Sequence, residues 1–347
     1  MSPRIMQLLL FSYALNTDPK HLPSVVLAQD HGQVVRSFLT GLKNSDYFSI
    51  VYEAHSEEEA LELVRQGKAQ FIINVPENFS RNLVRGERPK ILVQADATDP
   101  VAISGALSAL SGIIDGVAQK DFKGPLASLK TKQPAIDLRL HRMYNPEGFT
   151  RYNIVPGLIA IVLTMTGIMM TALAITRERE RGTMENLLAM PVRPIEVMAG
   201  KIAPYVMIGY IQSFIIVAVA KLLFDIPIIG SLWLLSLALL FFITCNMALG
   251  FTLSAVAQNQ TQAMQMSVMV TLPSIMLSGF LFPFHGMPLW ARVIGETLPV
   301  THFIRTSRGI LLKGNGFREI WPNLWPMLLF MLAVTFIAMK RYRKTLD

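Results

Sequence analysis

Long apolar stretches dominate the second half of the chain. A helix needs about 20 apolar residues to cross the hydrocarbon core of a bilayer. Four stretches reach or approach that length, and a fifth does so together with the residues just before it. They are Ile154–Ile175, Ile202–Phe224, Leu232–Val256, Met264–Phe284 and Ile320–Met339. The pattern therefore predicts five membrane-spanning helices in this half.

The first apolar stretch, Ile5–Leu15, is shorter than a full span. About 11 apolar residues make the core of a signal peptide or half of a membrane helix. The residues that follow, Asn16–Lys20, contain no small-residue cleavage site. We expect residues 1–16 to be the outer half of a first transmembrane helix that begins upstream of Met1, with a cleaved signal peptide as the alternative.

Between residues 17 and 152 the pattern changes to short segments that are typical of a water-soluble domain. Ser56 and Glu59 occupy the two positions of a capping box at the start of one predicted helix. Strands that alternate with helices favour a compact α/β domain. The expected strands are Ser24–Ala28, Tyr47–Glu53, Ala69–Val75, Lys90–Ala95 and Ile136–Arg142, and the expected helices are Gly32–Leu42, Ser56–Gln66 and Val101–Phe122.

Composition agrees with a membrane protein. Of the 347 residues 52% are hydrophobic and 16% are charged, and the mean hydropathy of +0.40 is too apolar for an ordinary soluble chain. The net charge of +8 does not indicate nucleic-acid binding, because the basic residues cluster beside apolar runs. A single cysteine, Cys245, excludes an intrachain disulfide and a cysteine-based metal cluster.

The basic residues predict which side of the membrane each loop faces. Short loops rich in Lys and Arg stay in the cytoplasm. Two segments carry such clusters, residues 176–201 and the tail Lys340–Lys344, and four spans separate them. One span lies between the α/β domain and the first cluster. We therefore expect residues 17–152 to lie outside the cytoplasm and residues 153–347 to form a transmembrane domain of five helices.

The segment 175–194 combines a charged helix end with a short amphipathic helix. It breaks at Gly182 and restarts after Thr183, a favoured capping residue, with Leu187 and Leu188 on one face. A helix of this kind on the inner membrane surface can pass mechanical force to the spans on both sides. The alternative is an interfacial anchor that only holds the helix ends in place.

A few polar residues interrupt the predicted spans. They either face a translocation path or hydrogen-bond between helices, where each contact contributes only about 0.6 kcal/mol. No predicted span carries a carboxylate or histidine near its centre, which argues against a proton-coupled carrier. The candidates for a translocation path are Thr164, Thr171, Gln212, Asn246, Gln265 and Ser278.

The sequence predicts no catalytic residue, no metal site and no cofactor bound by this chain. A phosphate-binding loop needs the pattern GxxxxGK[ST], and the glycine-rich Lys313–Phe317 does not fit it. His285 and His302 are too isolated to hold a metal. The hydrolase motifs GxSxG and HExxH are also missing. If ATP drives this protein, a partner must bind the ATP and its magnesium.

The sequence from Arg177 to Pro191, RERERGTMENLLAMP, resembles the signature that follows the second span in type-two ABC exporter permeases. Other segments are similar to further parts of that family, so the resemblance covers nearly the whole chain. The chain departs from the family at the front, where members have a cytoplasmic amphipathic helix and a complete first span. The further segments are Asn16–Pro23, Asp96–Pro100, Leu298–Phe303 and Arg341–Thr345.

The resemblance implies a fold, a location and a coupling site. The fold is an α-helical polytopic membrane protein of the bacterial inner membrane, with six spans and an inserted periplasmic α/β domain at residues 17–152. Residues 177–194 would form a cytoplasmic coupling helix that docks on an ATPase. The matching positions are Arg177, Glu178, Glu180, Gly182, Thr183, Glu185, Leu187, Leu188 and Pro191.

The function that follows is that of a permease subunit which is not itself an enzyme. Its expected partners are a separate ABC-type ATPase, a second permease subunit (identical or a paralogue), membrane lipids and a periplasmic adaptor, with no nucleic acid. The expected cargo is a small amphipathic or lipid-like compound that is exported across the inner membrane. The alternative function is a membrane-anchored sensor that uses the α/β domain as a receptor.

Overall fold

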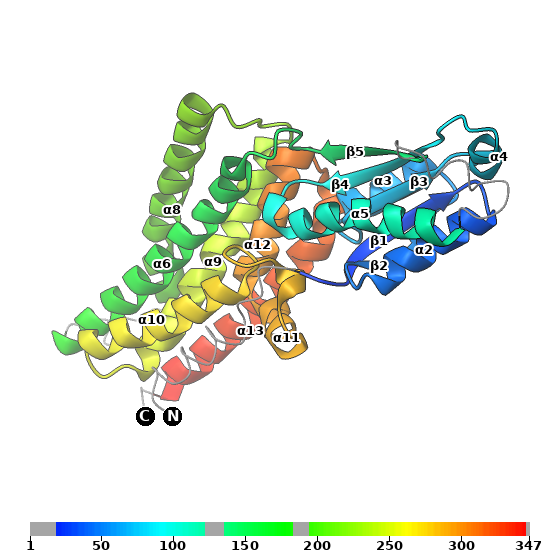
Figure 1. The fold of residues 1–347 in the computed structure, drawn as a ribbon. Coiled ribbons are helices and arrows are strands. Elements are labelled where there is room, and N and C mark those ends of the chain that lie inside the picture. The colour runs from blue at the N-terminus through cyan, green and yellow to red at the C-terminus, as the bar shows by residue number, and fades with distance from the viewer. Residues whose placement is uncertain (1–18, 122–134, 183–193, 345–347) are drawn as a thin grey trace. The chain divides into compact units, whose positions relative to one another are not determined.

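The computed structural model describes residues 19–121, 135–182 and 194–344 (Figure 1). The chain divides into two compact units. The first is Asn16–Thr150 with His285–Met287, and the second holds Arg151–Phe284 and Pro288–Asp347. We call them the α/β unit and the helical unit.

The α/β unit is built on one five-stranded sheet. The strand order is β2-β1-β3-β4-β5. β1 pairs in parallel with both β2 and β3, β4 runs antiparallel to β3, and β5 is parallel to β4. The strands are β1 (Leu22–Ala28), β2 (Phe48–Glu53), β3 (Phe71–Val75), β4 (Lys90–Asp96) and β5 (Asp137–Met143).

Four helices connect and cover these strands. Phe38 of α2, Phe71 of β3 and Leu110 of α5 are fully buried together in the main hydrophobic core. The predicted capping box exists in a shifted form, because Ser56 Oγ accepts from the Glu59 N–H at 3.2 Å while the Glu59 carboxylate accepts from His55 N–H. The helices are α2 (Gln33–Asn44), α3 (Glu57–Arg65), α4 (Phe79–Val84) and α5 (Pro100–Asp121).

The helical unit is centred on α9. Phe242 of α9 stacks on Phe303 of α12 with ring centroids 4.2 Å apart, and α13 packs along the same helix. A one-turn π-helix, η3, follows α12 directly. The elements are α6 (Thr150–Glu180), α8 (Pro194–Phe224), α9 (Leu232–Val256), α10 (Gln260–Leu277), η2 (Phe284–Gly286), α11 (Leu289–Thr297), α12 (Pro299–Arg308), η3 (Gly309–Lys313) and α13 (Phe317–Lys344).

Five helices among the described residues are long and apolar enough to cross a membrane. α5 is one of them, but its apolar side belongs to the core of the α/β unit, with Ile103, Leu110 and Ile114 buried against the sheet. The predicted span Met264–Phe284 corresponds to α10, whose 18 residues do not meet the same criterion. The five are Pro100–Asp121, Thr150–Glu178, Ala203–Phe224, Leu232–Val256 and Phe317–Ala338.

The helices therefore define a polytopic membrane protein, while six spans remain a prediction. The partial first helix predicted at Ile5–Leu15 lies outside the described residues, as does most of the predicted coupling helix.

The membrane helices differ in how much of their surface is covered. Half of the most apolar 18-residue stretch of α9 is buried. In the corresponding stretch of α8 only 17% is buried. Phe214, Leu222 and Leu223 of α8 are each at least 74% exposed. A helix with this surface is stable only in an apolar solvent or against another apolar surface.

Candidate functional site

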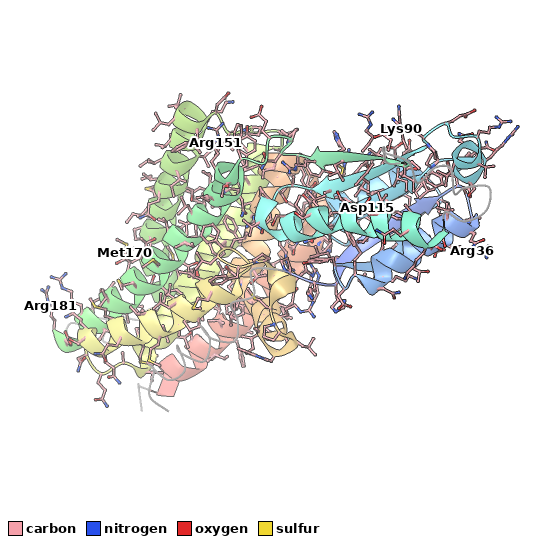
Figure 2. The ribbon with its side chains drawn as sticks, in the orientation of Figure 1. Arg36, Lys90, Asp115, Arg151, Met170 and Arg181 are labelled. Atoms are coloured by element: carbon pink, nitrogen blue, oxygen red, sulfur yellow. The ribbon has the colours of Figure 1, made fainter. Side chains whose placement is uncertain are left out.

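The described part of the predicted coupling segment is the C-terminal end of α6. Arg177, Glu180 and Arg181 are exposed there, and Figure 2 shows Arg181 at the end of this helix. Gly182 ends the helix with φ +71°, a left-handed conformation that glycine adopts without strain. The predicted break at Gly182 is thus a helix end. Thr183, Glu185, Leu187, Leu188 and Pro191 lie outside the described residues.

Glu180 is bonded to the beginning of α10. Its carboxylate accepts a hydrogen bond from the Gln260 backbone N–H at 2.8 Å and a second from Gln260 Nε2. The two donors engage the two carboxylate oxygens separately. We call this pair the Glu180–Gln260 clasp.

The clasp lowers the pKa of Glu180 below its ordinary value. The side-chain hydrogen bond from Gln260 is the largest cause and the backbone hydrogen bond is the next. Both donors favour the charged form of the carboxylate. Glu180 is therefore ionised at neutral pH, as the clasp requires.

The first turn of α10 is held by its own capping residues. Asn259 Oδ1 accepts from Gln262 N–H at 2.8 Å, and Gln262 Oε1 accepts from Gln258 N–H at 2.8 Å. Glu180 and Asn259 thus accept from two N–H groups of the first turn, those of Gln260 and Gln262, that have no backbone acceptor within the helix.

Small residues let α6, α9 and α10 approach closely near the clasp. Ala172 of α6, Ala257 after α9 and Ala263 of α10 are fully buried in one cluster. A Cβ on Gly250 of α9 would lie 2.5 Å from the carbonyl oxygen of Ile168. The backbones of α6 and α9 thus approach closely at Gly250, and α10 joins them at the alanine cluster.

The structure places the six path candidates in different environments. Thr164, Asn246 and Ser278 are buried and bond to carbonyls one turn earlier in their own helices or helix ends. Thr171 is 2% exposed, and its hydroxyl has no hydrogen-bond partner among the residues that the structure describes. Gln265 is exposed on α10.

Gln212, the sixth candidate, lines a pocket where α6, α8 and α9 meet. The Thr166 hydroxyl donates to Gln212 Oε1 at 3.0 Å, and the other lining residues are mainly apolar, including Met170 and Tyr205. The structure brings no second path candidate into this pocket. The pocket has a volume of only about 10 Å³, room for about one water molecule.

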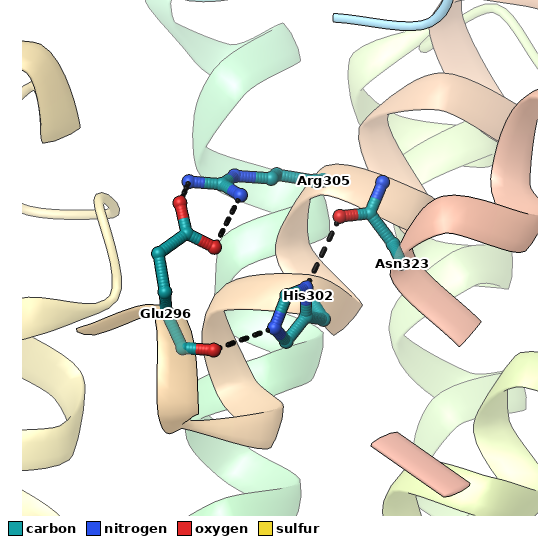
Figure 3. A network of polar contacts seen from close by, with 4 residues as sticks. All are labelled: Glu296, His302, Arg305 and Asn323. Carbon is teal, nitrogen blue, oxygen red and sulfur yellow. Dashed lines mark hydrogen bonds and ion pairs between the residues drawn. The ribbon is translucent and has the colours of Figure 1, made fainter. Parts of the chain in front are cut away.

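A second polar cluster joins α11, α12 and α13 (Figure 3). Arg305 donates to both carboxylate oxygens of Glu296, at 2.9 and 2.7 Å. His302 is 5% exposed and lies between the Glu296 carbonyl, 2.8 Å from Nε2, and Asn323 Oδ1, 3.2 Å from Nδ1. The guanidinium of Arg305 also lies 4.5 Å from the ring centre of Phe284.

Sequence reasoning missed both Gln260 and this second cluster. The pattern Asn259-x-x-Gln262 could have marked the start of α10 as a capping box. No local pattern links Gln260 to Glu180, which precedes it by 80 residues.

The apolar helices and the inserted sheet define a multi-pass membrane protein with an α/β unit. The chain matches the family described as "ABC-2 family transporter protein" over residues 5–340. It therefore belongs to this family, and it is the permease component of an ABC-2 type transporter.

Relatives of known name support this membership. The chain is 34% identical to the inner membrane transport permease YhhJ of Escherichia coli, over 81% of this chain and 74% of the relative. It is 27% identical to the probable multidrug ABC transporter permease YbhS, over 96% and 88%. The probable multidrug ABC transporter permease YbhR is 25% identical, over 99% and 92%. These matches give no support to the sensor alternative.

Proposed function

We propose that this chain is the permease subunit of an ATP-driven exporter in a bacterial inner membrane. It pairs with a second permease subunit, and the two enclose the translocation path. A separate ATPase binds ATP and magnesium and supplies the energy. Membership of the ABC-2 family supports an ATPase partner and a permease pair in general.

The observation that carries the proposal is the geometry around residues 183–193. Two apolar helices flank this segment. α6 ends before it, at Glu180, and α8 begins after it, at Pro194. Exposed Arg177 and Arg181 mark the same end. Basic residues at a helix end favour the cytoplasmic side, where an ATPase can reach the segment.

The orientation follows from the same charges. Residues 17–152 then form a periplasmic domain, and six spans, including α10 and the predicted first helix, cross the membrane. The periplasmic domain extends the exit of the path and provides a surface for a periplasmic adaptor.

The proposed substrate is a small amphipathic or lipid-like compound. A polar pair, Thr166 and Gln212, lies among the apolar side chains of α6, α8 and α9, and in the proposal the path opens there when the spans turn. Two relatives whose names include multidrug transport agree with such a substrate class.

In the proposed mechanism, ATP binding closes the ATPase dimer and pushes on the coupling helices. The push turns the attached spans, so that the path closes to the cytoplasm and opens to the periplasm. ATP hydrolysis then resets the assembly.

Co-purification tests the coupling role. The tagged chain is purified with candidate ATPases, and ATP hydrolysis is measured in lipid for the wild type, Glu185→Lys and Glu147→Lys. Glu147 is an exposed residue of the α/β unit, so its variant is a control for the same charge change. We expect Glu185→Lys to weaken ATPase binding about tenfold or more, the effect of about 1.4 kcal/mol, and Glu147→Lys to leave it unchanged. Equal binding by both variants contradicts the proposal.

Labelling in intact cells tests the orientation. Cys245→Ala removes the single cysteine, and new cysteines replace Asp115 or Arg181, which are exposed on the α/β unit and at the end of α6. A membrane-impermeant maleimide should label position 115 and not position 181. Labelling of position 181 from outside overturns the topology.

A further inference from the structure

The Glu180–Gln260 clasp places a carboxylate where one helix disfavours it and another favours it. Glu180 lies in the last turn of α6, next to the negative end of that helix dipole. Gln260 is the first residue of α10, at the positive end of its dipole. The charge at the end of α6 is thus stabilised mainly by α10.

The backbone bond in the clasp has a definite role in α10. The N–H of Gln260 belongs to the first turn of α10. No backbone carbonyl within the helix can accept a hydrogen bond from an N–H group at this position. Glu180 supplies the missing acceptor from a different helix, while Asn259 supplies the one for Gln262. Separation of α6 from α10 therefore leaves this N–H without its partner.

The helices on either side of residues 183–193 differ in how they are held. The end of α6 is held to α10 by the clasp, and Ala172 of α6 belongs to the buried cluster with Ala257 and Ala263. Between Ala203 and Phe224, only 17% of the most apolar stretch of α8 is buried. Force applied to the segment thus acts, on the α6 side, on a helix that is joined to α10.

We propose that Gln260 is a positioning residue that ties the end of α6 to α10, so that the coupling segment moves α6 and α10 as one body. The inference rests on the proposed function, because it assigns a role in transmitting the push from the ATPase. It adds the beginning of α10 to the parts of the chain that respond to the coupling segment.

A reducible chemical linker tests the proposal. Glu180→Cys and Gln260→Cys are combined in the Cys245→Ala background, and a short bis-thiosulfonate reagent links the two cysteines. ATP hydrolysis by the co-purified complex in lipid is measured before linking, after linking and after reduction. We expect the unlinked variant to lose at least threefold of its permease-dependent ATP hydrolysis, measured per bound ATPase. Linking should restore the rate, and reduction should remove it again.

Two results overturn the proposal. Full hydrolysis by the unlinked variant means that the clasp transmits nothing. Inhibition by the linker means that α6 and α10 must separate during the cycle. A merely structural role of the two side chains predicts loss of the assembled complex rather than loss of hydrolysis within it.

Side-chain exchange gives an independent test. Gln260→Glu places two carboxylates together and should reduce permease-dependent hydrolysis, whereas Glu180→Gln with Gln260→Glu reverses donor and acceptor and should recover most of it. Gln258→Ala is the matched control, because the side chain of Gln258 is exposed in the same loop. No recovery in the exchanged pair counts against the clasp.

The failure of the proposed function remains distinguishable from failure of the clasp. If the Cys245→Ala parent captures no ATPase, the proposed function fails. The clasp is then tested by melting temperatures in detergent. The double variant Gln260→Ala with Glu180→Ala should lower the melting temperature no more than either single change does. Additive losses show that the two residues do not act together.

Discussion

Gly230 lies where the loop between α8 and α9 meets η3. The N–H of Ile229 donates to the carbonyl of Leu311 at 3.0 Å. A Cβ on Gly230 would lie 2.3 Å from the carbonyl oxygen of Ile310. The obstacle is backbone in a buried turn, so no side chain can rotate away from it.

We predict that Gly230→Ala destabilises the helical unit by about 1–3 kcal/mol, the usual cost of overpacking. Gly112→Ala is the matched control, because it lies in the interior of α5 and a Cβ there meets no atom within 4 Å. The control should stabilise its helix by about 0.5–1 kcal/mol. Denaturant midpoints of the two variants in detergent measure both effects, and equal shifts contradict the prediction.

Asp30 ties the end of β1 to α4. Its carboxylate accepts from Ser80 N–H at 2.9 Å, from Ser80 Oγ at 2.8 Å and from Gly32 N–H at 2.7 Å. Burial is the largest single influence and raises the pKa of Asp30, but the hydrogen bonds from Ser80 and Gly32 together lower it below its ordinary value of 3.8.

This lowered pKa predicts the pH dependence of the α/β unit. A carboxylate with a lowered folded-state pKa contributes stability above its ordinary pKa and loses it as the pH falls through the folded-state value. Asp30→Asn should remove that contribution at neutral pH and flatten the curve of stability against pH between about pH 5 and pH 2. Urea midpoints at several pH values check this, and parallel curves for wild type and variant contradict it.

At the scale of elements, the Arg305–Glu296 pair joins α11 to α12. The pair is partly exposed, with side-chain exposures of 35% and 45%, so its contribution is about 1 kcal/mol or less. Arg305→Lys keeps the charge but loses the two parallel bonds and the contact with Phe284.

We predict that Arg305→Lys and Glu296→Gln each lower stability by up to about 1 kcal/mol and that the double variant costs less than their sum. Chemical unfolding, monitored by tryptophan fluorescence, measures the free energy of unfolding of the wild type, the two single variants and the double variant. A fully additive double variant shows that the two side chains are not coupled.

Most elements of the α/β unit follow from local pattern. β3 and β4 lie within a residue or two of the predicted stretches, because short apolar runs and a proline such as Pro76, which directly follows β3, are local signals. α12 was not predicted, although Leu298-Pro299 puts proline at the first helical position. The bond between Ile229 and Leu311 could not be predicted, since it joins two loops that are far apart in sequence.

The candidate site shows the same division. Gly182 could be recognised as a break, because a charged helix end followed by glycine is a local stop signal. Gln260 could not be recognised, because its role depends on the close approach of α6, α9 and α10 at Ala172, Gly250 and Ala263. Helix packing of this kind is decided by the whole unit.

At the scale of the whole molecule, we predict that the two compact units unfold separately, because each has a hydrophobic core of its own. All four tryptophans, at positions 233, 290, 321 and 325, belong to the helical unit. Tryptophan fluorescence therefore reports that unit alone, while far-ultraviolet circular dichroism reports both.

We predict two urea transitions in mild detergent, with an early loss of circular dichroism that fluorescence does not follow. Asp30→Asn should shift only the early transition, and Gly230→Ala only the late one, because distant sites act independently. A single transition seen equally by both probes contradicts this prediction.

The unequal covering of α8 and α9 has a consequence for how this sequence can evolve. The exposed side chains of α8, among them Phe214, Leu222 and Leu223, require only an apolar surrounding, so one aliphatic residue can replace another there with little loss. The buried side chains of α9 interlock with α12 and α13, where each change of volume is felt. A library of all single substitutions should show that α8 tolerates most apolar changes and that α9 does not. Among related proteins, the sequence of α8 should therefore vary much more than that of α9.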